Sequence, residues 1–246
     1  MPDRAQSILL TRLIALAYDD RFLVAPEAVA KVALAALGFD LVSVVWGTDF
    51  LGLFGQERVP YGTVSRGPNG HTYVALRGTA TVKEWLEDCW AVPEPWPFSQ
   101  DPGVHTHQGF TDLFETLSDS QGKGLPGALA GEQVIVTGHS LGAALAALCA
   151  AALGASCAYC ETFEGPRVGN EAFCKWMDGR VPAYFRDVII GDVVPHAPPE
   201  DLGYFHPGVE IDLDPSGVIP LTLDPEEYLK THHVLISVQL LLEAPS

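Results

Sequence analysis

The chain has few basic residues and no hydrophobic run long enough to cross a bilayer. Its 246 residues include 14 lysines and arginines against 31 acidic residues, for a formal net charge of −17. Such an acidic surface repels phosphate backbones, which argues against nucleic acid as a partner and against docking on anionic lipid through basic side chains. The most apolar stretches, 29–46 and 234–242, are interrupted by charges or too short for a transmembrane segment.

The sequence also lacks a secretory signal and a disulfide pattern. An acid precedes the first apolar run and no small-residue cleavage site closes it, so the sequence predicts cytoplasmic residence and leaves secretion of a processed form open. Five irregularly spaced cysteines do not suit a disulfide framework. The C-x-x-C pair of Cys157 and Cys160 lies in an apolar segment, which favours core packing over a metal or redox role.

No linker, repeat or low-complexity stretch divides the chain, so we expect a single domain over 1–246. Helical spacing covers 5–18, 26–37, 81–90 and 110–117. Strand-like patterns cover 41–46, 51–54, 71–76, 133–137, 158–163 and 183–190. The prolines at 93, 95 and 97 predict irregular backbone, and 234–242 fits either a helix or a strand. This alternation predicts an α/β fold with a mainly parallel central sheet and helices on both faces.

Ser140 lies in the clearest pattern of the sequence, a G-x-S-x-G segment between a buried strand and an Ala- and Leu-rich helix over 141–153. Gly138 and Gly142 allow a sharp reversal, because a Cβ at either place would clash. The hydroxyl of Ser140 is then expected to stand exposed above the sheet. The N–H of Leu141 lies at the helix N-terminus, where it would face a developing oxyanion. The pattern predicts a nucleophile rather than an ordinary turn serine.

A serine nucleophile needs a base, and in folds of this type the acid and then the histidine follow it along the chain. Asp192 is the preferred acid because it follows a predicted strand at its carboxyl end. Asp187 lies inside that strand, and Asp212 and Asp214 in a turn are weaker alternatives.

Four histidines follow Ser140 as possible bases. His196 is too near Asp192 in sequence to suit a triad, and a packing or surface role is expected for His206. His232 and His233 precede the last apolar stretch, and chemistry alone does not choose between them.

The remaining histidines predict no further chemistry. His105 and His107 match no common metal-ligand spacing, so we interpret them as loop histidines and expect no metal. His139 is expected to pack and hydrogen-bond under the turn. No organic cofactor is expected either, because a serine, a histidine and a carboxylate suffice for acyl transfer.

Five segments in the same order resemble the fungal-type triacylglycerol lipases, the class 3 lipase family. They are Leu76-Arg77-Gly78-Thr79, His107-Gln108-Gly109-Phe110, the segment from Val136 to Leu145, Pro166-Arg167-Val168-Gly169-Asn170, and Asp192-Val193-Val194-Pro195 with Pro198-Pro199. Together they extend over much of the chain, and five ordered matches are far more specific than any one of them.

The resemblance implies an α/β-hydrolase fold with lipid or other ester substrates. It implies Ser140 as nucleophile, Asp192 as the orienting acid, and an oxyanion hole made by Thr79 and Leu141, with Thr79 using both its N–H and its hydroxyl. It also implies a helical lid near 80–96 that opens at a lipid–water interface. One apolar helix face agrees with such a lid, namely Val82, Trp85, Leu86 and Trp90.

The sequence departs from the family pattern at three places. Glu164 stands where the family usually has glycine, and Val193 replaces a usual proline. The final histidine region has no aromatic residue after it, and the apolar spacing that follows favours His232 over His233 as the base.

The resulting hypothesis is acylglycerol hydrolysis through an acyl-enzyme. Alternatives with the same chemistry are a short-chain or feruloyl-type carboxylesterase and a phospholipase, and transfer of the acyl group to another acceptor is a further option. A non-catalytic member of the fold that binds lipid or protein is the rival from another class. The sequence does not determine the oligomeric state.

Overall fold

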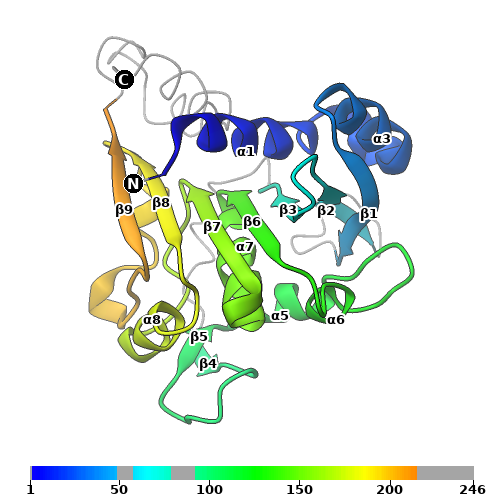
Figure 1. The fold of residues 1–246 in the computed structure, drawn as a ribbon. Helices are drawn as coiled ribbons and strands as arrows, with labels where there is room; N and C mark the ends of the chain where they lie inside the picture. The colour runs from blue at the N-terminus through cyan, green and yellow to red at the C-terminus, as the bar shows by residue number, and fades with distance from the viewer. Residues whose placement is uncertain (1, 49–57, 79–91, 215–246) are drawn as a thin grey trace.

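The computed structural model describes residues 2–48, 58–78 and 92–214. Within these ranges, seven strands form one sheet in the order β1-β2-β3-β6-β7-β8-β9 (Figure 1). They are β1 (Asp40–Gly47), β2 (Val59–Arg66), β3 (Thr72–Leu76), β6 (Val134–His139), β7 (Cys157–Phe163), β8 (Tyr184–Ile189) and β9 (Val209–Leu213). The five strands from β3 to β9 pair in parallel, and β1 and β2 pair antiparallel at one edge. The prediction of a mainly parallel sheet is therefore confirmed.

Helices cover both faces of this sheet, as predicted. The α-helices in the described ranges are α1 (Arg4–Leu16), α2 (Asp20–Val24), α3 (Pro26–Ala36), α5 (Gln108–Thr116), α6 (Leu125–Ala128), α7 (Leu141–Leu153) and α8 (Glu171–Asp178). On one face, Leu10, Leu13 and Ile14 of α1 are fully buried against the sheet. Helices α5, α7 and α8 contribute to the apolar cluster on the opposite face.

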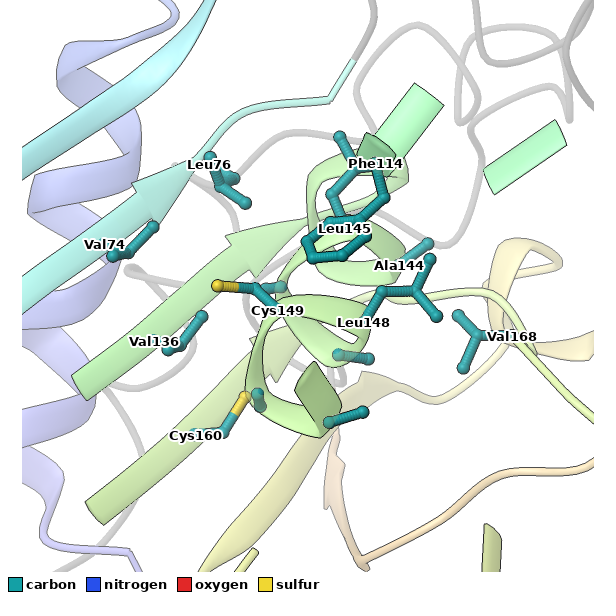
Figure 2. Close-up of a cluster of buried hydrophobic side chains, with 14 of the residues drawn as sticks. Val74, Leu76, Phe114, Val136, Ala144, Leu145, Leu148, Cys149, Cys160 and Val168 are labelled. Carbon is teal, nitrogen blue, oxygen red and sulfur yellow. The ribbon is translucent and has the colours of Figure 1, made fainter. Parts of the chain in front are cut away.

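The helix that follows Ser140 is the centre of the larger cluster. Residues 141–151 of α7 are all buried, because the helix is apolar on every side and is enclosed by the sheet and by α5. Figure 2 shows Cys149 of this helix on the side of the strand residues Val136 and Cys160, and Leu145 beside Phe114 of α5. A fully buried leucine such as Leu145 contributes about 2 kcal/mol relative to an exposed one. This packing holds the start of α7 rigidly at the end of β6.

The cysteines in the described ranges are free and buried, namely Cys149, Cys157, Cys160 and Cys174. Cys157 and Cys160 belong to the same core cluster as α7, as the packing interpretation predicted.

Two sheet strands do not follow the sequence patterns. β2 was not expected because Pro60 and Gly62 interrupt its β pattern, yet Gly62 is needed there, since a Cβ would lie 1.9 Å from the carbonyl oxygen of Ala75 on β3. β9 was also missed. It contains Asp212, for which the sequence predicts a turn. The apolar pattern of a strand is absent there because this edge strand keeps its polar side chains exposed.

The proline-rich stretch after residue 92 forms a strand, contrary to the expectation of irregular backbone. β4 (Pro93–Pro95) pairs with β5 (His105–His107), and proline is tolerated in a two-stranded ladder where its missing N–H has no obligatory partner. Trp96 directly after β4 is 1% exposed. The predicted lid near 80–96 therefore ends in a short β-ladder followed by a buried tryptophan. Residues 80–91 lie outside the described ranges, so the lid stays a prediction.

Candidate active site

The turn between β6 and α7 has the geometry that a nucleophilic serine requires. Ser140 has φ 57° and ψ −126°, a conformation that residues with side chains rarely adopt. Its N–H donates to the carbonyl oxygen of Phe163 at the end of β7, at 3.0 Å. Strain of this kind persists only where the surroundings enforce it, and it is concentrated at functional sites.

The two glycines beside Ser140 are required by close backbone contacts. A Cβ at Gly138 would lie 2.1 Å from the carbonyl oxygen of Gly142, and one at Gly142 would lie 2.4 Å from that of Leu76. Both distances are far below van der Waals contact, so neither position accepts a side chain. The clash predicted from the G-x-S-x-G pattern is confirmed.

Ser140 occupies the N-cap position of α7 without acting as a cap. A serine at this position normally accepts a hydrogen bond from an N–H of the first turn, whereas the Ser140 side chain makes no such bond. Leu141, as the first residue of the helix, places its N–H at the positive end of the helix dipole. The turn thus combines a hydroxyl that does not cap its own helix with a backbone N–H of the first turn.

The expectation of an exposed Ser140 is wrong, since the residue is only 2% exposed. Its neighbour across the turn is Gly78, where an added Cβ would lie 2.9 Å from the Ser140 Cβ and 2.9 Å from the His139 carbonyl oxygen. The loop that begins at Arg77 therefore packs directly on the serine. Thr79, the next residue, lies outside the described ranges.

A buried tyrosine from the N-terminal region connects the serine turn to this loop. The Tyr18 hydroxyl accepts a hydrogen bond from the Gly78 N–H at 2.8 Å and lies 2.6 Å from Nδ1 of His139. Arg77 also supports the loop, because its guanidinium donates to the carbonyl oxygens of Pro60 and Gly78. His139 thus packs and hydrogen-bonds beneath the turn, as predicted. Sequence reasoning missed Tyr18, because 121 residues separate it from His139 and no motif contains it.

Asp192 lies in a tight turn at the carboxyl end of β8, as predicted. Its N–H donates to the carbonyl oxygen of Ile189 at 3.0 Å, and Gly191 takes φ 98° between them. Oδ1 of Asp192 accepts a hydrogen bond from the Val194 N–H at 2.9 Å. The residue is 1% exposed, so its carboxylate is held in a fixed, water-poor position.

Arg167 holds the loop that follows Asp192. Its guanidinium donates to the carbonyl oxygens of His196 and Pro198 at 2.6 and 3.0 Å, and to Oε1 of Glu200 at 2.9 Å. The arginine is buried, and it binds three points of one short segment. The Pro-Arg-Val-Gly-Asn segment therefore has a structural role in positioning the acid loop.

Backbone hydrogen bonds join the serine turn to the aspartate turn through the end of β7. The Ser140 N–H donates to the carbonyl oxygen of Phe163. The N–H of the next residue, Glu164, donates to the carbonyl oxygen of Asp187 on β8 at 3.0 Å. The Ile189 N–H then bonds both carboxyl oxygens of Glu164, at 3.1 Å each. The carboxyl ends of β6, β7 and β8 thus form one connected unit.

Four buried carboxyl groups gather at the β7–β8 boundary. Glu161, Glu164, Asp187 and Asp192 are each at most 1% exposed. Glu161 accepts hydrogen bonds from the hydroxyls of Ser7 and Tyr159, and it faces Asp187, whose pKa burial raises well above its ordinary value. Burial likewise raises the pKa of Glu164 strongly, and the carboxyl of Asp192 beside it adds to the shift. Burial therefore disfavours the ionised form of both Asp187 and Glu164.

The structure describes two of the four histidines that follow Ser140. Nε2 of His206 hydrogen-bonds the carbonyl oxygen of Pro195 at 2.7 Å, and burial lowers the pKa of His206 to about 3, which agrees with the packing role expected for it. His196 is exposed in a 3-10 turn over Val194–His196. His232 and His233 lie outside the described ranges, so the choice between them stays a prediction.

His105 and His107 lie in β5 rather than in a loop, which corrects the interpretation of both. His107 is buried because it caps α5 by accepting from the Phe110 N–H and stacks on the Phe110 ring. In residues 2–48, 58–78 and 92–214, no three His, Cys, Asp or Glu side chains gather as a metal site would require. None of the helices within these ranges is long and apolar enough to span a membrane.

The parallel sheet, its flanking helices and the strained serine between β6 and α7 define an α/β-hydrolase fold. A family model described as Lipase (class 3) matches residues 73–202, more than half of the chain. The chain therefore belongs to the class 3 lipase family.

Two relatives illustrate the similarity in sequence. A lipase of Rhizomucor miehei is 34% identical over 162 residues, which are 60% of this chain and 43% of that protein. The secreted mono- and diacylglycerol lipase 1 of Fusarium solani is 31% identical over 146 residues, or 57% of this chain and 43% of that protein. The matches thus span less than half the length of these relatives. A secreted relative gives no support to the prediction of cytoplasmic residence.

Solved structures show the same fold over a larger share of the chain. The triacylglyceride lipase of Rhizomucor miehei has a TM-score of 0.68 and 26% identity, covering 85% of this chain and 79% of that chain. A triacylglycerol lipase whose catalytic centre is described as a serine protease triad has a TM-score of 0.67 and 27% identity, covering 85% and 80%.

Proposed function

We propose that this chain hydrolyses carboxylic esters of the acylglycerol type, with Ser140 as the nucleophile. The observation that carries the proposal is the strained, glycine-flanked turn, in which the Ser140 side chain does not cap α7 although it occupies the cap position. Membership of the class 3 lipase family supports lipid esters as substrates, and the relatives include enzymes named for mono- and diacylglycerols.

In the proposed mechanism, His232 takes the Ser140 proton while Oγ attacks the ester carbonyl, and the imidazolium then protonates the departing alcohol. Asp192 fixes the tautomer of the imidazole and stabilises its positive charge. The N–H groups of Thr79 and Leu141, with the Thr79 hydroxyl, stabilise the oxyanion. Water, deprotonated by the same histidine, attacks the acyl-enzyme and releases the fatty acid.

The first test compares hydrolysis of p-nitrophenyl butyrate by the wild type and by Ser140→Ala. We expect the substitution to lower kcat by more than about 10³-fold, because the nucleophile, its base and the acid act as a unit. Ser156→Ala, in the 3-10 turn that follows α7, is the matched control and should retain the wild-type rate. Equal rates for Ser140→Ala and the wild type would reject the proposal and favour a non-catalytic lipid-binding role.

The base is identified by His232→Ala and His233→Ala, measured separately under the same conditions. We expect the loss to be large for His232 and small for His233. The reverse result would reassign the base without changing the reaction.

Substrate class is tested with esters of increasing acyl length, each measured below and above its solubility limit. A rise in rate on passing that limit would support action at a lipid–water interface and a lid near 80–96. Saturation below the limit, with a preference for short chains, would favour a soluble carboxylesterase.

For localisation, the Fusarium relative, named as secreted, supports the alternative of a processed, secreted form.

A further inference from the structure

Glu164 occupies a position that is unfavourable for it in two ways. Its φ is 52°, and in the described ranges Ser140 is the only other non-glycine residue with positive φ. Side chains other than glycine adopt this conformation at an energetic cost. Glu164 is also only 1% exposed, although a carboxyl group is poorly solvated in the interior. A glycine would remove both costs, so the carboxyl must make interactions that compensate for them.

The compensating interactions all involve the turn that presents Asp192. The Ile189 N–H lies 3.1 Å from both Oε1 and Oε2 of Glu164, and the Ile189 carbonyl oxygen accepts the Asp192 N–H. The Asp192 carboxyl also lies within hydrogen-bonding reach of the Glu164 carboxyl and, with burial as the larger cause, raises the pKa of Glu164. The glutamate therefore contacts the backbone that positions the acid and the acid itself.

Two carboxyl groups in hydrogen-bond contact share a proton, because two adjacent buried negative charges are strongly unfavourable. Each carboxyl accepts one backbone N–H, Asp192 from Val194 and Glu164 from Ile189, and the Asp192 carboxyl raises the pKa of Glu164, which favours Glu164 as the protonated partner. The acidic groups that face Glu164 are Asp187 of β8 and Asp192 itself, and both disfavour ionisation of Glu164. Burial raises the pKa of Glu164 in the same direction.

We infer that Glu164 is a positioning residue of the catalytic acid, which it orients by donating a hydrogen bond from its protonated carboxyl to the Asp192 carboxylate. This inference rests on the proposed function in assigning Asp192 to the triad. The donated bond fixes one side of the Asp192 carboxylate while the Val194 N–H fixes Oδ1. Asp192 then has a single orientation toward the histidine, and its negative charge is partly delocalised onto the donor.

The kinetic test compares Glu164→Gln with Glu164→Leu. Glutamine retains a donor for Asp192 and an acceptor for the Ile189 N–H, whereas leucine has neither at a similar size. We expect Glu164→Leu to lower kcat about 10- to 100-fold with little change in KM, and Glu164→Gln to restore it to within about threefold. In alkaline solution the wild type should lose activity as Glu164 ionises beside Asp192, and Glu164→Gln should not.

A second readout does not depend on activity. A protonated buried carboxyl has an infrared C=O stretch separate from that of a carboxylate, and Glu164→Gln should remove one such band at neutral pH. Asp187→Asn is the matched control, because it removes a neighbouring buried acid of β8 and should abolish a different band.

Three results would overturn the inference. They are an unchanged infrared spectrum in Glu164→Gln, a Gln variant as impaired as the Leu variant, and the same alkaline loss in the wild type and the Gln variant. If Ser140→Ala shows that the chain has no esterase activity, the proposed function fails and Asp192 orients no catalytic base. The infrared band still decides whether Glu164 holds the shared proton. A Leu variant that does not fold leaves the Gln comparison and the spectrum to decide.

Discussion

The ends of β6 and β7 are neighbours in the sheet and differ in how each holds an unfavourable residue. Ser140 after β6 and Glu164 after β7 both have positive φ. Ser140 is held by sterics, because Gly138 and Gly142 bring backbone atoms so close that the chain has little other choice. Glu164 is held by the hydrogen bond that its carboxyl group accepts from the Ile189 N–H. Two adjacent turns thus reach a similar positive φ by different means, so they should respond differently to substitution and to pH.

The largest effect is expected at the sterically held turn. Gly138→Ala should lower the free energy of unfolding by about 3 kcal/mol, because a Cβ there would lie 2.1 Å from the Gly142 carbonyl oxygen and the backbone must shift. It should also abolish esterase activity, since the same backbone carries Ser140. Urea unfolding monitored by circular dichroism measures the first, and p-nitrophenyl butyrate turnover the second.

The control for this substitution is Gly127→Ala in α6, where the nearest atom to an added Cβ is the flexible Cε of Lys123 at 3.5 Å. It should be neutral or slightly stabilising. If both alanine variants behaved alike, close packing would not be what holds the serine turn.

A smaller effect is expected from Tyr18→Phe, which tests the contact between the serine turn and the loop at Gly78. The substitution removes the acceptor of the Gly78 N–H and the hydroxyl beside His139, which should lower the free energy of unfolding by about 1–2 kcal/mol. Because Gly78 precedes Thr79, kcat should fall more than stability alone explains. Thermal unfolding and steady-state kinetics measure the two quantities.

Tyr73→Phe is the comparison for Tyr18→Phe, because the Tyr73 hydroxyl accepts only a partly buried bond from Asn69 far from the turn. We expect it to leave kcat unchanged. If Tyr73→Phe lowered kcat as much as Tyr18→Phe does, Tyr18 would have no specific role at the serine turn.

The smallest expected effect is a pH dependence of the free energy of unfolding, and it comes from the buried carboxyl groups near the end of β7. Burial raises the pKa of Asp187 in the native state well above its ordinary value, while the unfolded chain releases this proton near an ordinary carboxyl pKa of about 4. Above that pH the native state binds more protons. The contribution of Asp187 to the free energy of unfolding is therefore fully present in acid, and it is lost as the pH rises through the pKa of Asp187 in the native state.

Asp187→Asn should remove this dependence, because asparagine stays neutral. Between about pH 5 and pH 6, the free energy of unfolding of the variant should rise relative to the wild type by up to about 1.4 kcal/mol. Urea unfolding at several pH values measures the difference, and Asp201→Asn at an exposed site should show none. A variant parallel to the wild type would mean that Asp187 is ionised in the native state.

Much of the architecture could be predicted from local pattern. The helix over 141–153 and the short apolar strand before it have simple periodicity, and α3 begins at Pro26 and ends before Gly38 as its capping signals indicate. The sequence patterns do not predict β2 and β9, because these strands depend on their place in the sheet and not on a local pattern. Gly62 is required by the neighbouring strand, and β9 is an exposed edge strand without an alternating apolar pattern.

The sequence by itself determined the family, the α/β arrangement and the position of Ser140 and Asp192 at strand ends, because each depends on residues adjacent along the chain. Only the tertiary structure decided that Ser140 is enclosed beneath Gly78, that Tyr18 supports it, and that Glu164 contacts Asp192. These contacts join residues distant in sequence, and burial, which decides whether a carboxyl keeps its proton, is a property of the packed molecule.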